Sequence, residues 1–179
     1  MTEILDDTEA LYRPHLDLSA LTLNGVALGA PAADVPRPGI DEAHSALVAR
    51  YRGGDDVESE YQDAEGRPLS LDEVVAHVVR SDGGLYCVGG FSYKVVGGSV
   101  VGFALYGPDL HRRFPGLASY EQFLAAFGTP DRVREDVQYG DLMGYDAYYW
   151  GARKHVAWDA CGNRVSLINF GDFEGNSAP

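Results

Sequence analysis

The 179-residue sequence contains few cysteines and no long hydrophobic run. Its two cysteines, Cys87 and Cys161, cannot form a disulfide framework and lack the CxxC spacing of a zinc site, so we expect two reduced, partly buried thiols. No apolar stretch approaches the length of a membrane span. The first 14 residues lack the basic start and the apolar core of a signal peptide. The sequence therefore predicts a cytoplasmic protein that does not enter a membrane.

Positive charge is scarce as well. The chain carries 27 acidic and 14 basic side chains, which gives a formal net charge of −13. This charge repels nucleic-acid phosphates and anionic membrane surfaces, so we expect neither as a partner. A positively charged protein partner fits better, although a high negative charge also serves solubility alone.

Metal-binding and catalytic motifs are missing too. The five histidines are spread along the chain without HxH, HxxxH or HExxH spacing, and no Lys-Ser/Thr pair follows the glycine-rich stretches, as a phosphate loop would need. The best nucleophilic set is Cys161 with His155 and Asp159, but Cys161 falls in a turn, DACGN, where a small residue is ordinary. Carboxylate pairs occur without a flanking apolar pocket. We expect no cofactor, no metal and no enzymatic activity.

What the sequence does contain is a short amphipathic helix followed by aromatic-rich strands, within residues 118–173. Ser119 and Gln122 form a capping-box pattern, and Gly128 is a stop signal. Apolar side chains between them recur at i, i+3, i+4 and i+7: Tyr120, Phe123, Leu124 and Phe127. The period then changes to two, which places Tyr145, Ala147 and Tyr149 on one strand face and Asp146, Tyr148 and Trp150 on the other.

The same helix pattern occurs once before. Ser70 and Glu73 form a second capping box, at a constant offset of 49 positions from Ser119 and Gln122. Strands broken at glycine pairs follow this helix as well. Helix and meander thus occur twice. The pattern predicts an α+β fold of two tandem helix-plus-antiparallel-meander units that form a sheet with helices on one face.

The expected organisation is an N-terminal tail (1–14), a first unit (15–107), a second unit (108–173) and a C-terminal tail (174–179). Residues 40–52 fit either a helix or a strand. An acidic string follows them, and we expect it to be a solvated strand edge, with a binding surface as the alternative. Its members are Asp55, Asp56, Glu58, Glu60, Asp63 and Glu65.

Three stretches of the second unit carry a resemblance: SYEQFLAAFGTPDRV, YDAYYW and HVAWDACGNRVSLINF. Together they resemble the helix-plus-meander repeat of β-lactamase inhibitor proteins, and small lipoproteins of outer-membrane assembly have a similar repeat. The acidic, Gly- and Tyr-rich chain also resembles the immunity proteins that bacteria keep beside polymorphic toxins. It departs from the inhibitor proteins because it has no secretion signal and no paired cysteines. The resemblance therefore implies a binding fold rather than β-lactamase as the target.

These observations favour a non-enzymatic cytoplasmic protein-binding module, an immunity-type inhibitor that neutralises a toxin. The expected partner-binding residues are Asp146, Tyr148 and Trp150 on one strand face, with His155 and Asp159 on the adjacent strand. Aromatic rings there would anchor a basic partner and carboxylates would steer it, unless another layer covers the rings. Two other functions stay open: a structural or assembly subunit that uses the same face, and a small enzyme with the Cys/His/Asp site. The oligomeric state also stays open.

Overall fold

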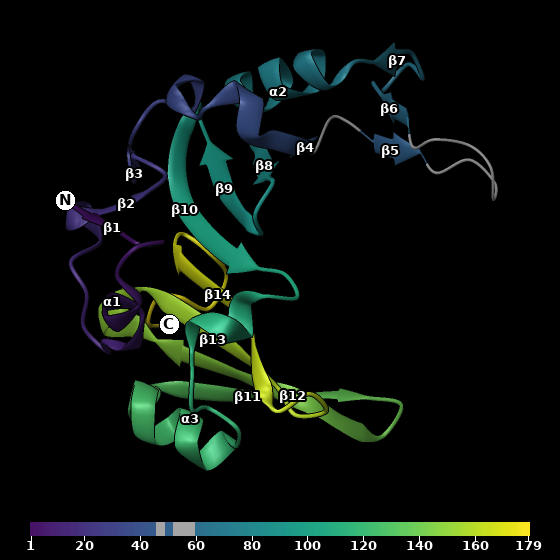
Figure 1. Ribbon diagram of the computed structural model, residues 1–179. Coiled ribbons are helices and arrows are strands. Elements are labelled where there is room, and N and C mark those ends of the chain that lie inside the picture. The colour runs from purple at the N-terminus through teal and green to yellow at the C-terminus, as the bar shows by residue number, and fades with distance from the viewer. Residues whose placement is uncertain (46–48, 52–59) are drawn as a thin grey trace. The chain divides into compact units, whose positions relative to one another are not determined.

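The computed structural model describes residues 1–45, 49–51 and 60–179. Within these ranges the protein has an α+β fold with three α-helices, an eight-stranded antiparallel sheet and two three-stranded sheets (Figure 1). The helices are α1 (Thr8–Tyr12), α2 (Leu71–Arg80) and α3 (Tyr120–Phe127). Short 3-10 helices are η1 (Leu18–Ala20), η2 (Ala32–Asp34), η3 (Arg37–Gly39), η4 (Leu110–Arg113) and η5 (Trp150–Ala152).

The eight-stranded sheet has the strand order β11-β12-β13-β14-β10-β9-β8-β4. In that order the strands are β11 (Arg132–Gln138), β12 (Asp141–Tyr149), β13 (Lys154–Asp159), β14 (Arg164–Gly171), β10 (Ser99–Tyr106), β9 (Phe91–Val96), β8 (Gly83–Cys87) and β4 (Ile40–Ser45). One small sheet consists of β1 (Thr2–Glu3), β2 (Leu21–Leu23) and β3 (Val26–Ala27), and the other of β5 (Ala49–Tyr51), β6 (Glu60–Gln62) and β7 (Pro68–Leu69). The antiparallel α+β class is therefore confirmed.

The chain divides into two compact units. One contains residues 1–28 and 102–179, and the other contains residues 29–101, so the division falls within β10. The sequence had instead suggested tails at both ends and a boundary at residue 107. Neither end is a free tail, because Ile4 and Leu11 are fully buried near the start of the chain and Asn176 is fully buried near its end.

Helices α2 and α3 cover the residues that the sequence predicts, because the capping residues fix where each helix begins. Ser70 and Glu73 make both reciprocal bonds of a capping box at α2. At α3, Ser119 Oγ accepts from the backbone N–H of Gln122 at 3.3 Å, while the side chain of Gln122 accepts from the backbone N–H of Ala118 at 2.8 Å. Gly128 then ends α3 with φ = +79°, a value that glycine adopts without strain. The two helix predictions are confirmed.

Residues 40–52 contain strands wherever the structure describes them, namely β4 and β5. The helical alternative is wrong for β4, since residues 40–45 pair with β8. Of the acidic string, Asp55, Asp56 and Glu58 lie outside the described residues.

In the unit of residues 29–101, α2 buries the side chains of Val74, Val75 and Val78.

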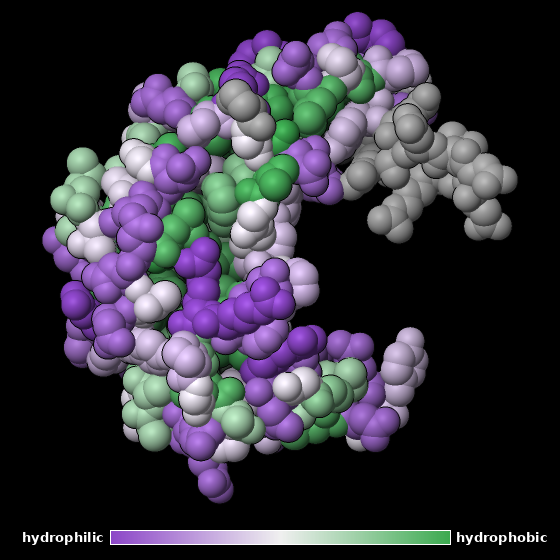
Figure 2. Space-filling view, in the orientation of Figure 1, coloured by the Kyte–Doolittle hydropathy of each residue, from purple (hydrophilic) through white to green (hydrophobic). Residues whose placement is uncertain are grey.

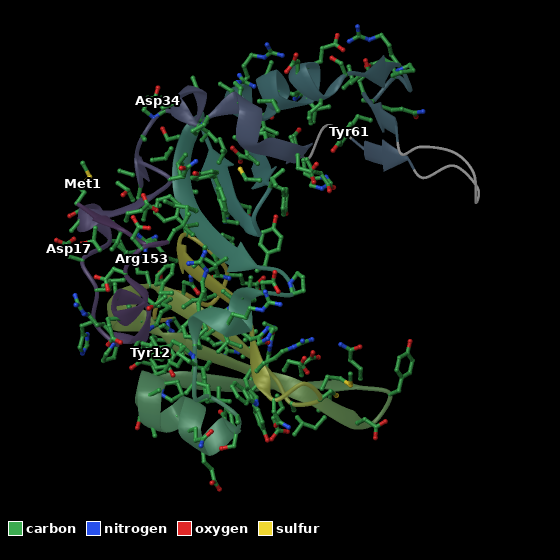
Figure 3. The ribbon with its side chains drawn as sticks, viewed as in Figure 1. Met1, Tyr12, Asp17, Asp34, Tyr61 and Arg153 are labelled. Atoms are coloured by element: carbon green, nitrogen blue, oxygen red, sulfur yellow. The ribbon has the colours of Figure 1, made fainter. Side chains whose placement is uncertain are left out.

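In the other unit, α3 packs its rings on one face of the strands, which we call the inner face. Phe123 lies 5.5 Å from Trp158 and Phe127 lies 6.4 Å from Tyr149, between ring centroids. Tyr12 of α1, labelled in Figure 3, contacts Phe127 at 4.9 Å. Burial of these rings stabilises this unit, because the hydrophobic gain scales with the apolar area removed from water.

Candidate functional site

The opposite, outer face of β12 and β13 brings together three of the five expected binding residues. The register pairs Tyr148 with His155, and the two rings stack with centroids 4.8 Å apart. His155 Nε2 lies 2.8 Å from Asp146 Oδ1. The alternation read from the sequence is thus confirmed for residues 145–149, with Tyr145 and Tyr149 contacting α3 on the inner face.

Both ring nitrogens of His155 are occupied. Nε2–H donates to Asp146, and Nδ1 accepts from Asn169 Nδ2 at 3.1 Å, an arrangement that requires the neutral tautomer with the hydrogen on Nε2. Asn169 Oδ1 in turn accepts from Asn176 Nδ2 at 2.9 Å. We call Asp146, His155, Asn169 and Asn176 the outer-face network. With neither nitrogen free, His155 is poorly placed to move a proton or bind a metal.

Arg134 of β11 extends this network through Asp146. Its Nη2 and Nε donate to Asp146 Oδ2 at 2.7 and 3.0 Å. Burial alone would raise the pKa of Asp146, but the hydrogen bonds from Arg134 and His155 outweigh burial and lower it. Burial also lowers the pKa of His155, against a smaller opposing effect of Asp146. At neutral pH the network therefore contains a carboxylate, a guanidinium and a neutral imidazole.

The expectation that the Tyr148 ring is exposed to a partner is wrong, because the side chain is buried, at 6% exposure. The chain's own C-terminal segment covers it, as the alternative of a second layer had allowed. Gly175 has φ = +83°, and a Cβ there would come within 2.6 Å of the Tyr148 ring. Trp150, at the start of η5, is partly exposed, and its Nε1–H donates to the carbonyl of Gly175 at 3.1 Å.

Asp159 serves the turn between β13 and β14. Its Oδ1 accepts from the backbone N–H groups of Cys161 and Gly162, both at 2.9 Å, and its Oδ2 accepts from Arg164 Nε at 3.1 Å. The backbone bond from Gly162 is the largest of the effects that lower the pKa of Asp159. Since His155 is bound to Asp146 and Asn169, the Cys161/His155/Asp159 set is not assembled.

The two thiols differ from each other. Cys161 is exposed in its turn, whereas Cys87 is buried in the other unit. Burial raises the pKa of the Cys87 thiol to about 11, so it is protonated at neutral pH. The prediction of partly buried thiols holds for Cys87 and is wrong for Cys161.

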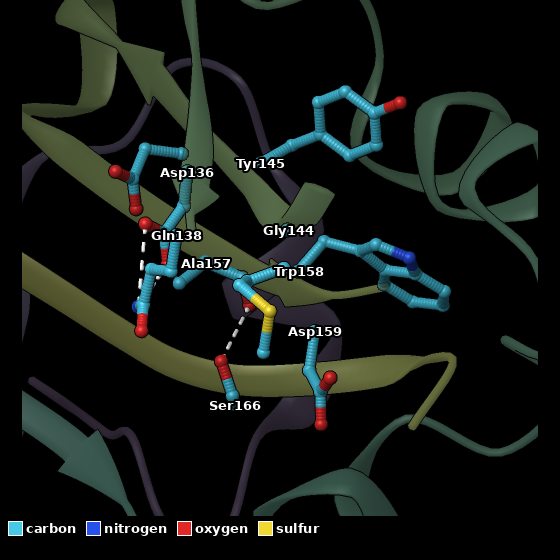
Figure 4. Close-up of a pocket in the computed structure, with 10 residues that line it drawn as sticks. Asp136, Gln138, Gly144, Tyr145, Ala157, Trp158, Asp159 and Ser166 are labelled. Carbon is cyan, nitrogen blue, oxygen red and sulfur yellow. Dashed lines mark hydrogen bonds between the residues drawn. The ribbon is translucent and has the colours of Figure 1, made fainter. Parts of the chain in front are cut away.

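Two hollows lie beside the network on the outer face. One, of about 250 Å³, is the acidic hollow shown in Figure 4, where Asp136 and Gln138 stand at one side and Asp159 at the other. Its walls are Asp136, Gln138, Met143, Gly144, Tyr145, Asp146, Ala157, Trp158, Asp159 and Ser166. The other, of about 270 Å³, is lined by Arg132, Arg134, Tyr148, His155, Asn169, Phe173, Glu174 and Gly175.

Asp136 differs from the other two carboxylates of the acidic hollow. Asp146 and Asp159 each face an arginine, whereas Asp136 accepts only from the amide of Gln138, at 3.3 and 3.5 Å. Among the described residues no basic side chain lies within ion-pair distance of Asp136. Its negative charge is therefore available to a ligand.

The β11–β12 hairpin carries the most exposed side chains of this region. Every residue of β11 is exposed, and Figure 2 shows hydrophobic side chains reaching the surface over the hairpin. They include Val133, Val137 and Leu142. At the tip Tyr139 is fully exposed with φ = +55°, and Gly140 follows with φ = +91°. These angles fit the two-residue turn that Asn-Gly usually fills.

The part of the chain that the structure describes offers no group of three or more His, Cys, Asp or Glu side chains that could hold a metal ion. None of its helices is long and apolar enough to span a membrane. Comparison with protein-family models, curated proteins and solved structures found no match.

Sequence reasoning missed several residues that shape this face. Asn169, Gly175 and Asn176 belong to no periodic pattern, so only the fold reveals their roles. Arg134 sits in a strand exposed on both faces, which weakens the period-two signal. Tyr139 could have been found, because Tyr-Gly stands just before the alternating segment of β12, at a turn where Asn-Gly would be usual.

Proposed function

We propose that the protein is a non-enzymatic protein-binding module, an immunity-type inhibitor that neutralises a basic toxin. In this proposal Tyr139 at the hairpin tip anchors the partner, and the acidic hollow receives one of its basic side chains. The outer face of β12 and β13 is held in place by the contacts among Asp146, Tyr148 and His155. Trp150 lies at the border of this face, and Asp159 borders the acidic hollow.

Tyr139 is the observation that carries the proposal. A left-handed backbone conformation costs a residue with a bulky side chain about 1 kcal/mol, and asparagine or glycine would avoid most of that cost. The tyrosine gains nothing visible in return, since its side chain is fully exposed. Exposed aromatic rings on rigid turns are efficient anchors in protein interfaces, because few rotamers are lost on binding.

The charge of the chain and the acidic hollow support a basic partner. A net charge of −13 speeds the approach of a positive protein. Asp136 then offers a carboxylate without a cation, beside the apolar side chains of Met143 and Ala157. A lysine or arginine side chain matches that combination, because it has an apolar stem and a charged end.

The tandem interpretation of the fold belongs to the same proposal. Each of α2 and α3 begins after a capping serine and is followed by strands that pair antiparallel with their sequence neighbours. We propose that the chain contains two such helix-plus-meander units, with helices on one face of the common sheet. This arrangement would leave the other face for a partner.

The test is a titration against the protein that co-purifies with this chain, which the proposal expects to be a basic toxin, with two variants of one residue. Tyr139→Asn should weaken binding by roughly 2 kcal/mol, while Tyr139→Phe, which keeps the ring, should bind like the parent. Tyr139→Asn should not lower the unfolding midpoint, because asparagine tolerates the turn conformation. Parent-like binding by Tyr139→Asn would contradict the proposal.

The non-enzymatic part has its own test. Cys161→Ser should leave toxin neutralisation unchanged, because the thiol lies in an exposed turn and the Cys/His/Asp set is not assembled. The measurement is survival of toxin-expressing cells that carry either protein at equal abundance. Loss of protection by a folded Cys161→Ser protein would favour an enzyme instead.

A further inference from the structure

The free edge of β11 has no strand partner in the part of the chain that the structure describes. β11 is the first strand of the sheet, and in the described chain β12 is its one strand neighbour. Alternate N–H and C=O groups of an edge strand point away from the sheet and can pair with another strand. Proteins usually block such edges with proline, a bulge or charged side chains, and the four charged side chains of β11 disfavour any strand whose charges do not match them. β11 contains no proline. The register of the β11–β12 pair shifts between Asp136 and Val137, but the extra residue, Met143, lies on β12, so β11 itself carries no bulge.

The sequence of β11 is nearly complementary to itself. Read antiparallel about Glu135, the strand places Arg134 opposite Asp136 and Val133 opposite Val137, each pair occurring twice by symmetry. Arg132 meets Gln138, also twice. The faces agree, because Arg134 and Asp136 stand opposite Asp146 and Gly144 on the outer face, while Val133 stands opposite Ala147 on the inner face.

We propose that β11 pairs with β11 of a second copy of this chain, antiparallel about Glu135, to form a symmetric dimer. The edge hydrogen bonds supply the pairing, and the opposite charges and valines fix the register. Arg134 can serve its own Asp146 and the second copy's Asp136 together, because Nη1 is not used in the bond to Asp146. A strand-edge contact is small, so the dimer is weak and depends on concentration.

Charge sets the dimer's response to salt. Glu135 meets its own copy on the two-fold axis, and each chain carries a net charge of −13, so two copies repel each other. Salt screens this long-range repulsion more than it weakens the close Arg134–Asp136 pairs, so salt strengthens the dimer. The salt response is opposite to that expected for a basic partner, whose binding salt weakens. The inference goes beyond the proposed function and is tested on the chain alone.

The experiment uses two substitutions of the exposed residue Gln138, followed by sedimentation velocity over a range of protein and NaCl concentrations. Gln138→Glu places a carboxylate opposite Arg132 of the second copy, twice, and should tighten the dimer roughly fivefold. Gln138→Lys places two positive pairs there and should weaken it by a similar factor. If only the general repulsion between acidic chains mattered, Gln138→Lys would dimerise more tightly than Gln138→Glu, because glutamate adds negative charge to each chain and lysine reduces it.

A third variant removes the one unfavourable pair. Glu135→Gln should tighten the dimer at low salt and reduce its salt dependence. Hydrogen exchange should show slower exchange in residues 132–138 as the protein concentration rises. The proposal is overturned if Gln138→Lys associates more strongly than Gln138→Glu. It is equally overturned if the parent and Glu135→Gln stay monomeric under all conditions, or if larger assemblies form.

Discussion

Lys154 and His155 are neighbours on β13, and they point to opposite faces of the sheet. Each is a buried titratable residue that holds one end of the chain. Lys154 Nζ donates to the carbonyls of Leu11 and Arg13 at 2.9 and 2.8 Å, so the inner face binds the N-terminal segment. His155 holds Asn169, whose side chain accepts from Asn176, so the outer face binds the C-terminal segment.

The two sides differ in how they tolerate burial. Lys154 is 0% exposed, and burial lowers its pKa to about 7, although its Nζ also lies over the rings of Tyr149 and Phe127 at 4.7 and 5.1 Å. On the outer face the C-terminal segment is instead held through a neutral imidazole and two amides, which lose less on burial than an ion does. The contribution of Lys154 to stability should therefore change with pH above neutrality, and the contribution of His155 should change with pH below neutrality.

The largest expected effect comes from opening the inner face. Phe127→Ala should lower the free energy of unfolding by about 3–5 kcal/mol, because the ring fills space between Tyr12, Phe114 and Tyr149. Chemical denaturation measures the loss. Leu124→Ala, on the less buried side of α3, is the control and should lose clearly less. Equal losses would mean that the inner face is not the core of this unit.

The second effect is on the outer face. Asn176→Ala removes the donor to Asn169 Oδ1 and to the carbonyls of Arg153 and Gly171, and should cost about 1–3 kcal/mol. Fluorescence should also report greater exposure of Trp150, whose indole is bonded to Gly175. Ser177→Ala, at the exposed neighbouring position, should change neither quantity. A parent-like Asn176→Ala protein would mean that the outer face does not hold the C-terminus.

Much of the inner face could be predicted from the sequence. Capping serines, helical spacing and alternation are local signals, and they placed α2, α3 and the faces of Tyr145–Tyr149 correctly. The ties of the chain ends could not be predicted. Lys154 reads as a polar residue in a strand, and its burial depends on carbonyls about 140 positions earlier in the chain.

The outer face could be predicted only in part. Alternation put Asp146, Tyr148 and His155 together, which is a consequence of strand geometry. It gave no sign that a segment after β14 would cover Tyr148, because Gly175 and Asn176 lie outside any period. It also failed at Trp150, where the strand gives way to η5 and the period ends.

A third prediction concerns the pH response of the inner face. Burial lowers the pKa of Lys154 from its usual 10.5 to about 7 in the folded protein, so between these values the unfolded chain binds more protons. The contribution of Lys154 to stability should therefore rise from pH 7 to 10.5, by at most roughly 1.4 kcal/mol per pH unit, whereas Cys87, whose pKa burial raises from 9.0 to about 11, opposes this rise above pH 9. Lys154→Met should lose this rise. Denaturation of both proteins across this range makes the comparison, and parallel curves would show that Lys154 does not titrate there.

The smallest expected effect is the matching response of the outer face to acid. Burial lowers the pKa of His155 below its usual 6.5, so the unfolded chain takes up a proton first as the pH falls. The contribution of His155 is thus complete above pH 6.5 and declines below it, by roughly 1 kcal/mol or less between pH 6.5 and 5. His155→Gln keeps a donor and an acceptor but does not titrate, so the difference between the two proteins should shrink as the pH falls from 7 to 5. Asp146 is ionised throughout that range because its pKa lies below 3.8, which leaves His155 as the titrating member of the outer-face network. A difference that grows on acidification would mean that Asp146 stabilises the protonated imidazole more than burial opposes it, and the contrast with Lys154 would fail.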